Sequence, residues 1–373
     1  MKTAVVILNW NTREFLRRWL PGLIESCKAL GTDPETGEDL AEVMVADSAS
    51  TDGSMEMMAE EFPGVRTIPL DANYGFTGGY NKALAEVDAE YFVLINSDIE
   101  VGPDWLGPLV EWMDTHPDCG VCGPKLHALD CLDKDATAAG ARFSRTERFE
   151  YAGAAGGLID RFGYPFCRGR VLGRTEMDEG QYDTPADVLW TSGACMMTRG
   201  SLWRGLGGLD DRFFAHMEEI DYCWRAQLAG WKVSVVPASV VWHLGGGTLP
   251  QTSPFKLKLN FRNGLMLLEN NLPSTFMAEG LSGKKAIAKA RRRIRFRKFL
   301  DLGSALVYLL GGKKDFAAAV LQAHREYDGL SKGLRTDAGT HMPSGLSGIC
   351  IIPQAALRKE KIFKYIREHE NRH

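Results

Sequence analysis

Short apolar runs alternate with amphipathic segments along the first hundred residues, and this alternation limits the fold more than any other feature. Residues 4–8 form a continuous apolar run, which is typical of a strand covered on both faces. Similar runs lie at 43–46, 65–68 and 91–95, with helix-like segments between them. This order predicts an α/β fold with a doubly wound, mostly parallel sheet. Ligands of such sheets bind outside the carboxyl ends of the strands, so we expect a site in the loops that begin at Asn9, Asp47, Asp71 and Asn96.

The rest of the chain divides into two further regions. Residues 140–187 are rich in glycine, aromatic and charged residues with weak periodicity, which predicts loops and antiparallel strands laid over the first half. Regular patterns return with a helix at 219–229, a strand at 232–236 and a helical segment from 253. We expect one α/β domain over 1–272, with halves at 1–125 and 126–272, and a basic, helical C-terminal tail over 273–373.

The composition excludes several classes of protein. The net charge of -4 and the hydrophobic content of 45% give no sign of nucleic-acid binding. The eight cysteines are scattered and predict no disulfide framework, and Cys119 and Cys122, which lack a second pair at zinc spacing, are expected to be inert core thiols. No signal-peptide cleavage site follows the N-terminus, and no segment reaches the roughly 20 apolar residues that span a bilayer. These features predict a cytoplasmic location.

Two acids stand at the ends of predicted strands. Asp98, in Asn96-Ser97-Asp98, follows the run at 91–95 and would lie at the carboxyl edge of the sheet, where hard oxygen ligands suit a divalent cation. Asp47 follows the run at 43–46 and could accept a hydrogen bond from the N3–H of uracil or thymine. Both positions are equally consistent with simple turns, because Asn, Ser and Asp favour strand ends.

Three other segments are candidates for chemistry. Residues 73–79 form a glycine-rich loop before a helix, a setting in which backbone N–H groups approach phosphates. The loop lacks the G-x-G-x-x-G spacing, which argues against a nicotinamide enzyme. Glu218, Glu219 and Asp221 start a helix among bulky apolar residues, which favours a lined cavity, although acids also stabilise a first turn by roughly 0.3–1 kcal/mol each. His243 follows a strand-like segment and is either a metal ligand or a structural residue.

Taken together, these segments resemble the family 2 glycosyltransferases of the GT-A fold, and the bacterial rhamnosyltransferase-like branch in particular. The resemblance covers roughly residues 3–271. Each motif is weak alone, but their order along the chain is specific. They are Val6-Ile7-Leu8-Asn9-Trp10-Asn11, Asp47-Ser48-Ala49-Ser50-Thr51-Asp52-Gly53-Ser54, Asn73-Tyr74-Gly75-Phe76, Asn96-Ser97-Asp98, Trp190-Thr191-Ser192-Gly193-Ala194, Gly207-Gly208-Leu209-Asp210, Glu218-Glu219-Ile220-Asp221 and Val241-Trp242-His243-Leu244-Gly245-Gly246.

The resemblance implies an inverting, metal-dependent transfer of a sugar from a UDP- or dTDP-sugar to a hydroxyl acceptor, in bacterial surface polysaccharide synthesis. Residues 1–125 would hold the nucleotide-sugar and 126–272 the acceptor, which would be a glycan or lipid-linked. The cofactor would be Mg²⁺ or Mn²⁺. The implied donor-binding residues are Asn9, Asn11, Asp47, Asn73, Gly75 and Asn96; the metal ligands are Asp98 and His243; the general base is Glu219; and the acceptor side is lined by Trp190, Gly193, Ala194 and Glu218.

Two positions depart from the family's pattern. Asn96 stands where the first Asp of the D-x-D metal motif is usual, so the cation would have one anionic ligand fewer. Glu219 stands where Asp is more usual, which keeps a carboxylate and lengthens its reach by one methylene. With an ordinary pKa of about 4.3, Glu219 would be ionised at neutral pH, as a base must be.

The tail has a strong local charge. Lysines and arginines crowd residues 284–298 with no acid among them, and an apolar stretch over 300–310 follows. This pattern favours contact with an anionic membrane surface, although a solvated helix face or a basic patch in an oligomer has the same composition. Two alternative functions remain open: a sugar-nucleotide nucleotidyltransferase, which would need a basic, glycine-rich triphosphate loop after the first strand, and a non-catalytic nucleotide-sugar or membrane-binding scaffold.

Overall fold

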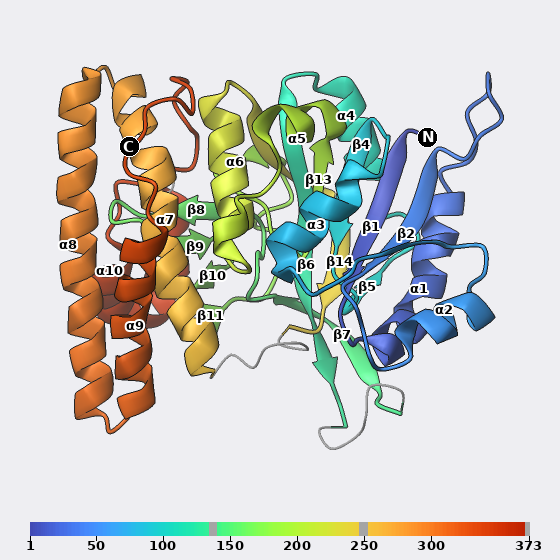
Figure 1. Cartoon of the computed structure of the whole chain (residues 1–373), viewed down its shortest axis with the longest axis horizontal. Helices are drawn as coiled ribbons and strands as arrows, with labels where there is room; N and C mark the ends of the chain where they lie inside the picture. Colours follow the sequence, from blue (N-terminus) through green and yellow to red (C-terminus); the bar gives the residue numbers. More distant parts are fainter. Residues whose placement is uncertain (134–139, 246–252, 370–373) are drawn as a thin grey trace.

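The computed structural model describes residues 1–133, 140–245 and 253–369. Over these residues a ten-stranded mixed sheet forms the centre of the molecule (Figure 1), with strand order β12-β14-β6-β13-β4-β1-β2-β3, β5 paired to β14 and β7 paired to β6. The strands are β1 (Thr3–Asn9), β2 (Ala41–Asp47), β3 (Arg66–Pro69), β4 (Tyr91–Ile95), β5 (Ile99–Val101), β6 (Cys119–Cys131), β7 (Phe143–Phe149), β12 (Ala186–Asp187), β13 (Cys195–Arg199) and β14 (Lys232–His243).

The long strands of this sheet run mostly in one direction. β1 pairs in parallel with β2 and β4, β2 with β3, and β6 with β14. β13 lies antiparallel between β4 and β6. The carboxyl ends of β1, β2, β4, β6 and β14 therefore meet at one edge of the sheet, the lower end in Figure 1. The predicted doubly wound, mostly parallel sheet is confirmed.

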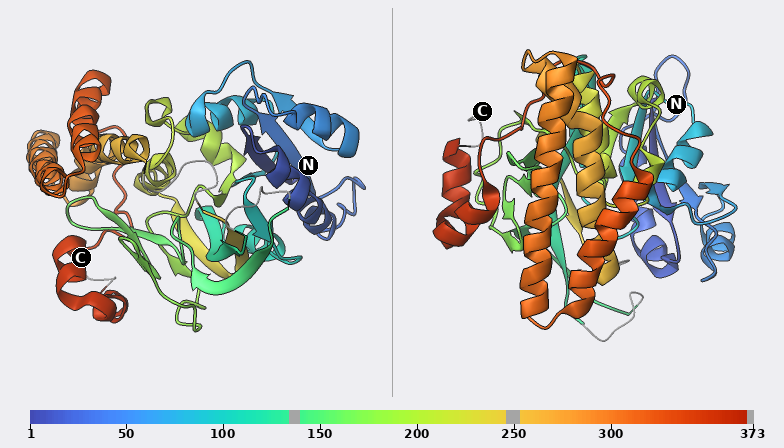
Figure 2. Two further views of the ribbon diagram at one scale, coloured as in Figure 1. Left: turned by 90° about the horizontal axis from the view of Figure 1, so that it is seen from below. Right: turned by 60° about the vertical axis from the view of Figure 1, so that its left-hand side comes forward.

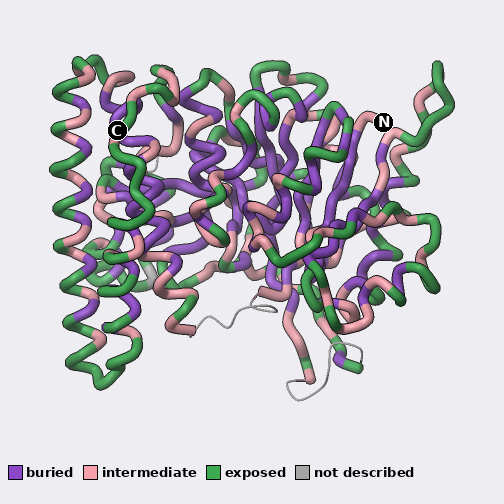
Figure 3. The backbone as a smooth tube through the Cα atoms, viewed as in Figure 1, coloured by how far each residue is buried: buried purple, intermediate pink, exposed green. Residues whose placement is uncertain are grey.

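Helices cover both faces of the sheet because alternate side chains of each buried strand point to opposite faces. In β1, Val5 and Ile7 pack in one cluster with α1, α2 and α4, and Ala4 and Val6 pack in another with α3, α5 and α6. Figure 3 shows the buried central strands between more exposed helices. These helices are α1 (Arg13–Lys28), α2 (Ser54–Glu61), α3 (Gly75–Ala85), α4 (Gly107–Thr115), α5 (Gly200–Leu206) and α6 (Glu218–Leu228), with a short 3-10 turn, η1 (Asp211–Phe213).

The C-terminal third is built onto this core instead of trailing from it. α7 (Pro254–Ala278) packs against α6, α8 (Gly283–Leu310) and α9 (Lys314–Leu330), and α8 and α9 form an antiparallel pair on the outer side of the molecule (Figure 2). The predicted boundary after residue 272 falls inside α7, and the predicted boundary after residue 125 falls inside β6. Each element continues through the predicted division because it packs against neighbours on both sides of it.

A second, four-stranded antiparallel sheet lies beside the α7–α9 helices and is completed by the end of the chain. Its strands are β8 (Gly157–Ile159), β9 (Pro165–Cys167), β10 (Arg170–Val171) and β11 (Arg174–Thr175). Leu346 bridges to Ile159. The helices α10 (Ile351–Arg358) and α11 (Ile362–His369), joined by the 3-10 turn η2 (Lys359–Lys361), bury Leu158, Phe166 and Val171 (Figure 2).

Several local predictions are confirmed by these elements. The strands at 4–8, 43–46, 65–68 and 91–95 are present to within two residues, and the helix expected from 219 begins at Glu218. The strand at 232–236 was predicted too short, because β14 continues to His243 beside β6. All eight cysteines are free thiols, with Cys119 and Cys122 buried. Among the described residues no helix has the length and hydropathy needed to cross a bilayer.

Candidate active site

Asp47 and Asn9 lie side by side at the carboxyl ends of β2 and β1, where the parallel register pairs them directly. Asn9 Nδ2 donates a 2.7 Å hydrogen bond to Asp47 Oδ1, and the backbone N–H of Ser50 donates to Asp47 Oδ2 at 2.9 Å. Asp47 is 3% exposed. Each carboxylate oxygen keeps a lone pair for a further donor, so the base-reading role predicted for Asp47 requires a ligand that adds to these bonds.

Asn11 closes the same pair of loops. It adopts a left-handed conformation, with φ of 55°, and its side-chain oxygen accepts a 2.8 Å hydrogen bond from the backbone N–H of Thr51. Asn tolerates this conformation better than most residues. Asn11 therefore joins the loop after β1 to the loop after β2, beside Asp47.

Thr12 connects this first cluster to the loop after β4. Its hydroxyl lies 2.5 Å from Asn9 Oδ1 and 2.8 Å from Ser97 Oγ. Ser97 directly precedes Asp98, which is 5% exposed. The polar residues at the ends of β1, β2 and β4 thus form one continuous hydrogen-bonded row along the sheet edge.

His243, the last residue of β14, lies between two buried carboxylates. Its Nε2 is 3.2 Å from Asp98 Oδ1 and its Nδ1 is 3.2 Å from Glu150 Oε2. Burial alone would lower the pKa of His243, but the charges of Asp98 and Glu150 outweigh it and raise this pKa well above its usual value. Burial likewise opposes ionisation of Asp98, yet the charge of His243 brings the pKa of Asp98 below its usual value. The ring is therefore an imidazolium at neutral pH.

These side chains fit a cation that is shared with a phosphate-bearing ligand better than one held by protein alone. Among the described residues no three His, Cys, Asp or Glu side chains are arranged to hold a metal ion together. Asp98 and His243 supply one carboxylate and one imidazole, and Mg²⁺ sites commonly combine one or two carboxylates with substrate phosphates and water. The imidazole must lose its proton before it can bind a cation.

Glu150 was not predicted from the sequence. It directly follows β7, is 5% exposed, and lines a cavity of about 220 Å³ together with His243 and Tyr151. Lys256 was also missed. It is half-buried in the first turn of α7, where the charges of Glu150 and Asp98 partly offset the lowering of its pKa by burial. Neither residue belongs to a recognisable sequence pattern, because each enters the site through tertiary packing.

Glu219 lies in the first turn of α6, against the segment that leads into β13. A Cβ atom added to Gly193 would lie 3.4 Å from Glu219 Cβ and 3.3 Å from the ring of Phe76. The neighbouring Ala194 carbonyl accepts a 2.9 Å hydrogen bond from the backbone N–H of Asn96. Glu219 therefore lies beside the segment that is hydrogen-bonded to Asn96, two residues before Asp98.

The ionisation of Glu219 differs from the expectation that it has an ordinary pKa. Burial raises the pKa of Glu219 to about 7, although backbone N–H groups of the α6 first turn and the charge of Arg170 oppose the rise. Burial, followed by the charge of Glu219, raises the pKa of Glu218 well above its usual value. Burial therefore favours the neutral form of Glu218, and Glu219, with a pKa of about 7, is close to half ionised at pH 7. Sequence alone did not reveal this difference, because it depends on packing around the helix start.

The third acid of this motif has a structural environment. Asp221 is fully buried and forms a 2.7 Å ion pair with Arg225, while Asn270 and Asn271 of α7 donate to its other oxygen. Asp221 therefore fixes α6 to α7, and its charge is fully matched.

Cys167 links the two acidic parts of the site. Burial raises the pKa of this thiol to about 11, and the charges of both Glu150 and Glu219 add to the rise. Both carboxylates therefore act on one side chain of β9. Glu150 also contacts His243, so Asp98, His243 and Glu150 lie together at the carboxyl edge of the sheet.

The glycine-rich loop meets the segment that precedes α6. Asn73 Oδ1 accepts a 2.8 Å hydrogen bond from Gly75 N, at the start of α3. Gly75 has φ of +70°, and a Cβ atom there would lie 2.5 Å from both the ring and the carbonyl oxygen of Phe214. Glycine is thus required at this position for its conformation and for the close approach.

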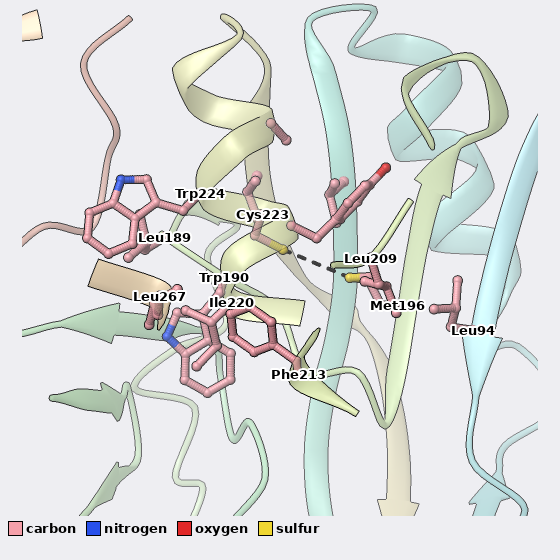
Figure 4. Close-up of a cluster of buried hydrophobic side chains, with 14 of the residues drawn as sticks. Leu94, Leu189, Trp190, Met196, Leu209, Phe213, Ile220, Cys223, Trp224 and Leu267 are labelled. Carbon is pink, nitrogen blue, oxygen red and sulfur yellow. Dashed lines mark hydrogen bonds between the residues drawn. The ribbon is translucent and has the colours of Figure 1, made fainter. Parts of the chain in front are cut away.

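Trp190 occupies a different environment from the one predicted for it. It is 1% exposed, its indole N–H donates to the carbonyl of Leu158, and it packs in the core with Phe213 and Ile220 (Figure 4). In this structure Trp190 fills the core instead of lining an open acceptor surface. Gly193 and Ala194, a few residues later, do lie at the site, against Glu219 and Asn96. Gly246, the last residue of the predicted His243 motif, lies outside the described residues.

A family model described as glycosyl transferase family 2 matches residues 4–168. Over these residues, fewer than half of the chain, the sequence is similar to glycosyl transferase family 2. The matched region includes the row from Asp47 to Asp98 and also Glu150, whereas Glu219 and His243 lie beyond it.

Curated relatives of this chain include rhamnosyltransferases. The N-acetylglucosaminyl-diphospho-decaprenol L-rhamnosyltransferase of Mycobacterium tuberculosis is 27% identical over 212 residues, which is 54% of this chain and 66% of that protein. The rhamnosyltransferase WbbL of Escherichia coli is 25% identical over 174 residues, 44% of this chain and 59% of that protein. The chain thus matches about two thirds, or less, of the length of these relatives.

Solved structures support the same fold. The crystal structure of GalNAc-T7 with UDP, GalNAc and Mn²⁺ aligns with 78% of this chain and 54% of that chain, at 16% identity and a TM-score of 0.50. At this level of identity the likeness shows the fold, which is the GT-A fold.

A strained loop lies between η1 and α6. Phe214, His216 and Met217 have φ values of 63°, 70° and 72°. A left-handed conformation costs a non-glycine residue about 1–3 kcal/mol and persists where surrounding contacts determine it. The loop ends at Glu218, so the strain lies directly before the acidic first turn of α6.

Proposed function

We propose that this chain transfers a sugar from a UDP- or dTDP-sugar to a hydroxyl group of a glycan or lipid-linked acceptor, with inversion of the anomeric configuration. The observation that carries the proposal is the continuity of the site. One polar row joins Asp47 to Ser97, Asp98 and Glu150 flank His243, and Glu219 packs beside the Asn96 loop.

Each end of this row suits one part of a nucleotide-sugar. Asp47, with a lone pair left on each carboxylate oxygen, accepts the N3–H of a pyrimidine base, and Asn9 and Asn11 hold the pocket around it. Asn73 and Gly75 order the loop over the ribose and diphosphate. Asp98 and His243 would hold a divalent cation, which neutralises charge on the departing diphosphate when bound. Lys256 adds positive charge on the same side.

The reaction is a single displacement. Glu219 takes the proton of the acceptor hydroxyl, whose oxygen forms a bond to the anomeric carbon as the bond from that carbon to the diphosphate oxygen breaks. A carboxylate with a pKa of about 7 suits this role, because the best general base has a pKa near the working pH. Gly193 lies beside Glu219, where the absence of a side chain lets the segment before β13 approach the base.

The related rhamnosyltransferases give the proposal its acceptor class. The mycobacterial relative is named for a diphospho-decaprenol substrate, and a lipid-linked acceptor of this kind places the reaction in surface polysaccharide synthesis. The proposal is tested by incubating the protein with UDP- and dTDP-sugars, Mn²⁺ or Mg²⁺, and short polyprenyl-diphosphate sugars. Slow hydrolysis of one nucleotide-sugar without acceptor, and transfer with it, is the expected result. Binding without turnover of any nucleotide-sugar contradicts the proposal and favours a non-catalytic scaffold, while formation of nucleotide-sugar from a triphosphate favours a nucleotidyltransferase.

We also propose that α8 contacts an anionic bilayer. The outward side of its second half carries exposed apolar residues, of which Phe299 is 68%, Val307 69% and Leu310 80% exposed, and Leu302, Leu306 and Leu309 lie beside them. Part of the basic run is consumed internally, since Arg297 is buried against Asp301 and Lys289 pairs with Glu279. The exposed cations that remain are Lys284, Lys285, Arg291, Arg292 and Arg295, with Lys313 and Lys314 at the turn after α8.

The position of α8 supports the same proposal. The turn between α8 and α9 lies at the same end of the molecule as the carboxyl ends of β6 and β14 (Figure 1). Exposed apolar side chains at one end of a helix can enter the interfacial region of a bilayer, and nearby lysine and arginine side chains are attracted to anionic lipid headgroups. Insertion of the apolar second half of α8 at this end would bring a lipid-linked acceptor toward the carboxyl ends of β6 and β14, where His243 ends β14.

A further inference from the structure

Asn263 holds the strained loop before α6 through its side-chain amide. This residue of α7 has no exposed surface, and its Nδ2 lies 3.0 Å from the carbonyl oxygen of Phe213, 2.8 Å from that of Ala215 and 2.6 Å from that of His216. The two amide hydrogens are thus shared among three carbonyl groups of one short segment. The same segment contains the left-handed residues Phe214, His216 and Met217.

Arg262 fixes the orientation of this amide. Its Nε donates a 2.9 Å hydrogen bond to Asn263 Oδ1, which leaves the Nδ2 end pointing at the loop. Its Nη2 donates to the carbonyl of Phe213 at 2.7 Å. A side-chain amide reads equally well in two orientations from shape alone, so this bond from a group that can only donate decides which end faces the loop.

The clamped loop touches both halves of the proposed reaction. On one side, the carbonyl of Phe214 accepts a 3.2 Å hydrogen bond from the backbone N–H of Thr77, and its ring packs on Gly75 in the glycine-rich loop. On the other side, Met217 ends the loop and Glu219 follows two residues later in the first turn of α6. A shift of the loop therefore moves the carboxylate of Glu219 relative to the glycine-rich loop.

We propose that Asn263, oriented by Arg262, is a positioning residue that holds residues 213–217 in the conformation that aims Glu219 at the acceptor. The inference rests on the proposed function in naming Glu219 as the base, but the clamp itself is a property of the fold. Catalytic groups lose about 100-fold in rate when they are misplaced by about 1 Å. A clamp on the segment directly before the base is therefore expected to act mainly on kcat.

The test compares three variants of the full chain. Asn263→Asp keeps the size of the side chain and the oxygen that accepts from Arg262. It replaces the NH₂ group that donates to the loop carbonyls with an oxygen, which can only accept. Arg262→Lys removes the planar fork while keeping the charge, and serves as the milder variant if Asn263→Asp folds poorly. Thr275→Val is the matched control, because Thr275 is also a buried polar residue of α7 but bonds Trp224 and Asn271, away from the loop.

Two readouts separate positioning from stability. Hydrogen exchange of the amides at 214–219 reports the loop without any turnover, and we expect exchange at least tenfold faster in Asn263→Asp and Arg262→Lys but unchanged in Thr275→Val. The pH profile of kcat reports Glu219. A loosened loop admits water to the carboxylate, so the acid limb is expected to move to lower pH while kcat falls by about 100-fold in Asn263→Asp.

The outcomes are distinct. Unchanged exchange at 214–219 in both variants overturns the clamp, whatever the activity. The positioning role is overturned if Asn263→Asp and Arg262→Lys exchange faster at 214–219 but have the same kcat and the same acid limb as Thr275→Val. Failure of the wild-type protein to transfer sugar contradicts the proposed function and leaves the exchange result readable by itself.

Discussion

Gly193 and Glu219 are packed against each other so closely that a methyl group on the glycine would touch the Cβ of the glutamate at 3.4 Å. The segment entering β13 thus lies against the first turn of α6, and the same segment accepts a hydrogen bond from Asn96. This contact makes Glu219 part of the sheet-edge site although it lies on a helix beyond the family match.

Adjacent carboxyl groups at the start of α6 should respond differently to the same substitution. Glu219→Gln is expected to lower kcat by about 10²–10⁴-fold, the usual contribution of a general base, while leaving nucleotide-sugar binding within about threefold. Glu218→Gln is the matched control, because burial favours the neutral form of the Glu218 carboxyl and the amide preserves its shape. Steady-state kinetics and calorimetric titration of the donor measure both effects. Full activity of Glu219→Gln would remove Glu219 from the mechanism.

The rate should depend on pH through the same carboxylate. A base works only when ionised, and burial raises the pKa of Glu219 to about 7. We therefore expect kcat to fall tenfold per pH unit below about 6 and to level off above about 8. The profile is measured with a saturating donor and acceptor between pH 5 and 9. An acid limb near pH 4.5, the ordinary value for glutamate, would contradict the burial of this group.

Cation binding should release a proton. His243 is an imidazolium between Asp98 and Glu150, so a cation can bind its Nε2 only after the proton leaves. Titrations of Mn²⁺ with UDP, in buffers of different ionisation enthalpy, are expected to show close to one proton released at pH 7 and an affinity that rises from pH 6 to pH 8. Affinity independent of pH would exclude His243 as a ligand.

Glu150 should affect the cation without touching it. A carboxylate on the second ring nitrogen orients a ligating histidine, and loss of such partners typically weakens metal binding by 10–100-fold. Glu150→Gln is expected to weaken Mn²⁺ binding in this range and to reduce proton release, because the pKa of His243 falls. Glu147→Gln, on the exposed part of β7, provides a control with the same chemistry. Equal affinities for the two variants would contradict this role for Glu150.

Membrane contact should depend on where an exposed leucine lies. Leu310, at the end of α8, is 80% exposed and Leu357, on α10, is 78% exposed. Leu306→Asn with Leu310→Asn is expected to abolish flotation with phosphatidylglycerol liposomes, since burial of a leucine contributes about 1.5–3 kcal/mol, whereas Leu357→Asn should leave it unchanged. Both variants should keep wild-type activity on a short, water-soluble acceptor. Equal loss of flotation in the α8 variant and in Leu357→Asn would contradict the proposed surface. So would sedimentation that shows a wild-type dimer which Leu310→Asn dissociates.

Much of the sheet and of its edge was predictable because the signals are local. Apolar runs end abruptly at Asn9, Asp47 and Asn96, and parallel strands must gather such ends at one edge. The state of Glu219 was not predictable, since its raised pKa depends on the burial of its carboxyl group in the folded chain.

Residues that enter the site from distant elements left no sequence signal. Glu150 follows an irregular edge strand, and Asn263 is one polar residue on a long helix whose contacts lie in a loop before a different helix. For Trp190 the sequence signal was present but its interpretation differs from the structure. Its place in a family-like motif predicted an acceptor-side role, whereas the side chain is packed in the core.

The second sheet depends on the last residues of the chain, and this has a consequence for biosynthesis. Leu346 pairs with Ile159, and α10 and α11 cover Leu158, Phe166 and Val171. The middle of the chain leaves the ribosome well before the residues that complete its sheet. Its apolar strands must then wait, partly uncovered, until translation passes residue 366. A nascent chain stalled before that point would expose these strands, and chaperones that bind apolar segments should recognise it there.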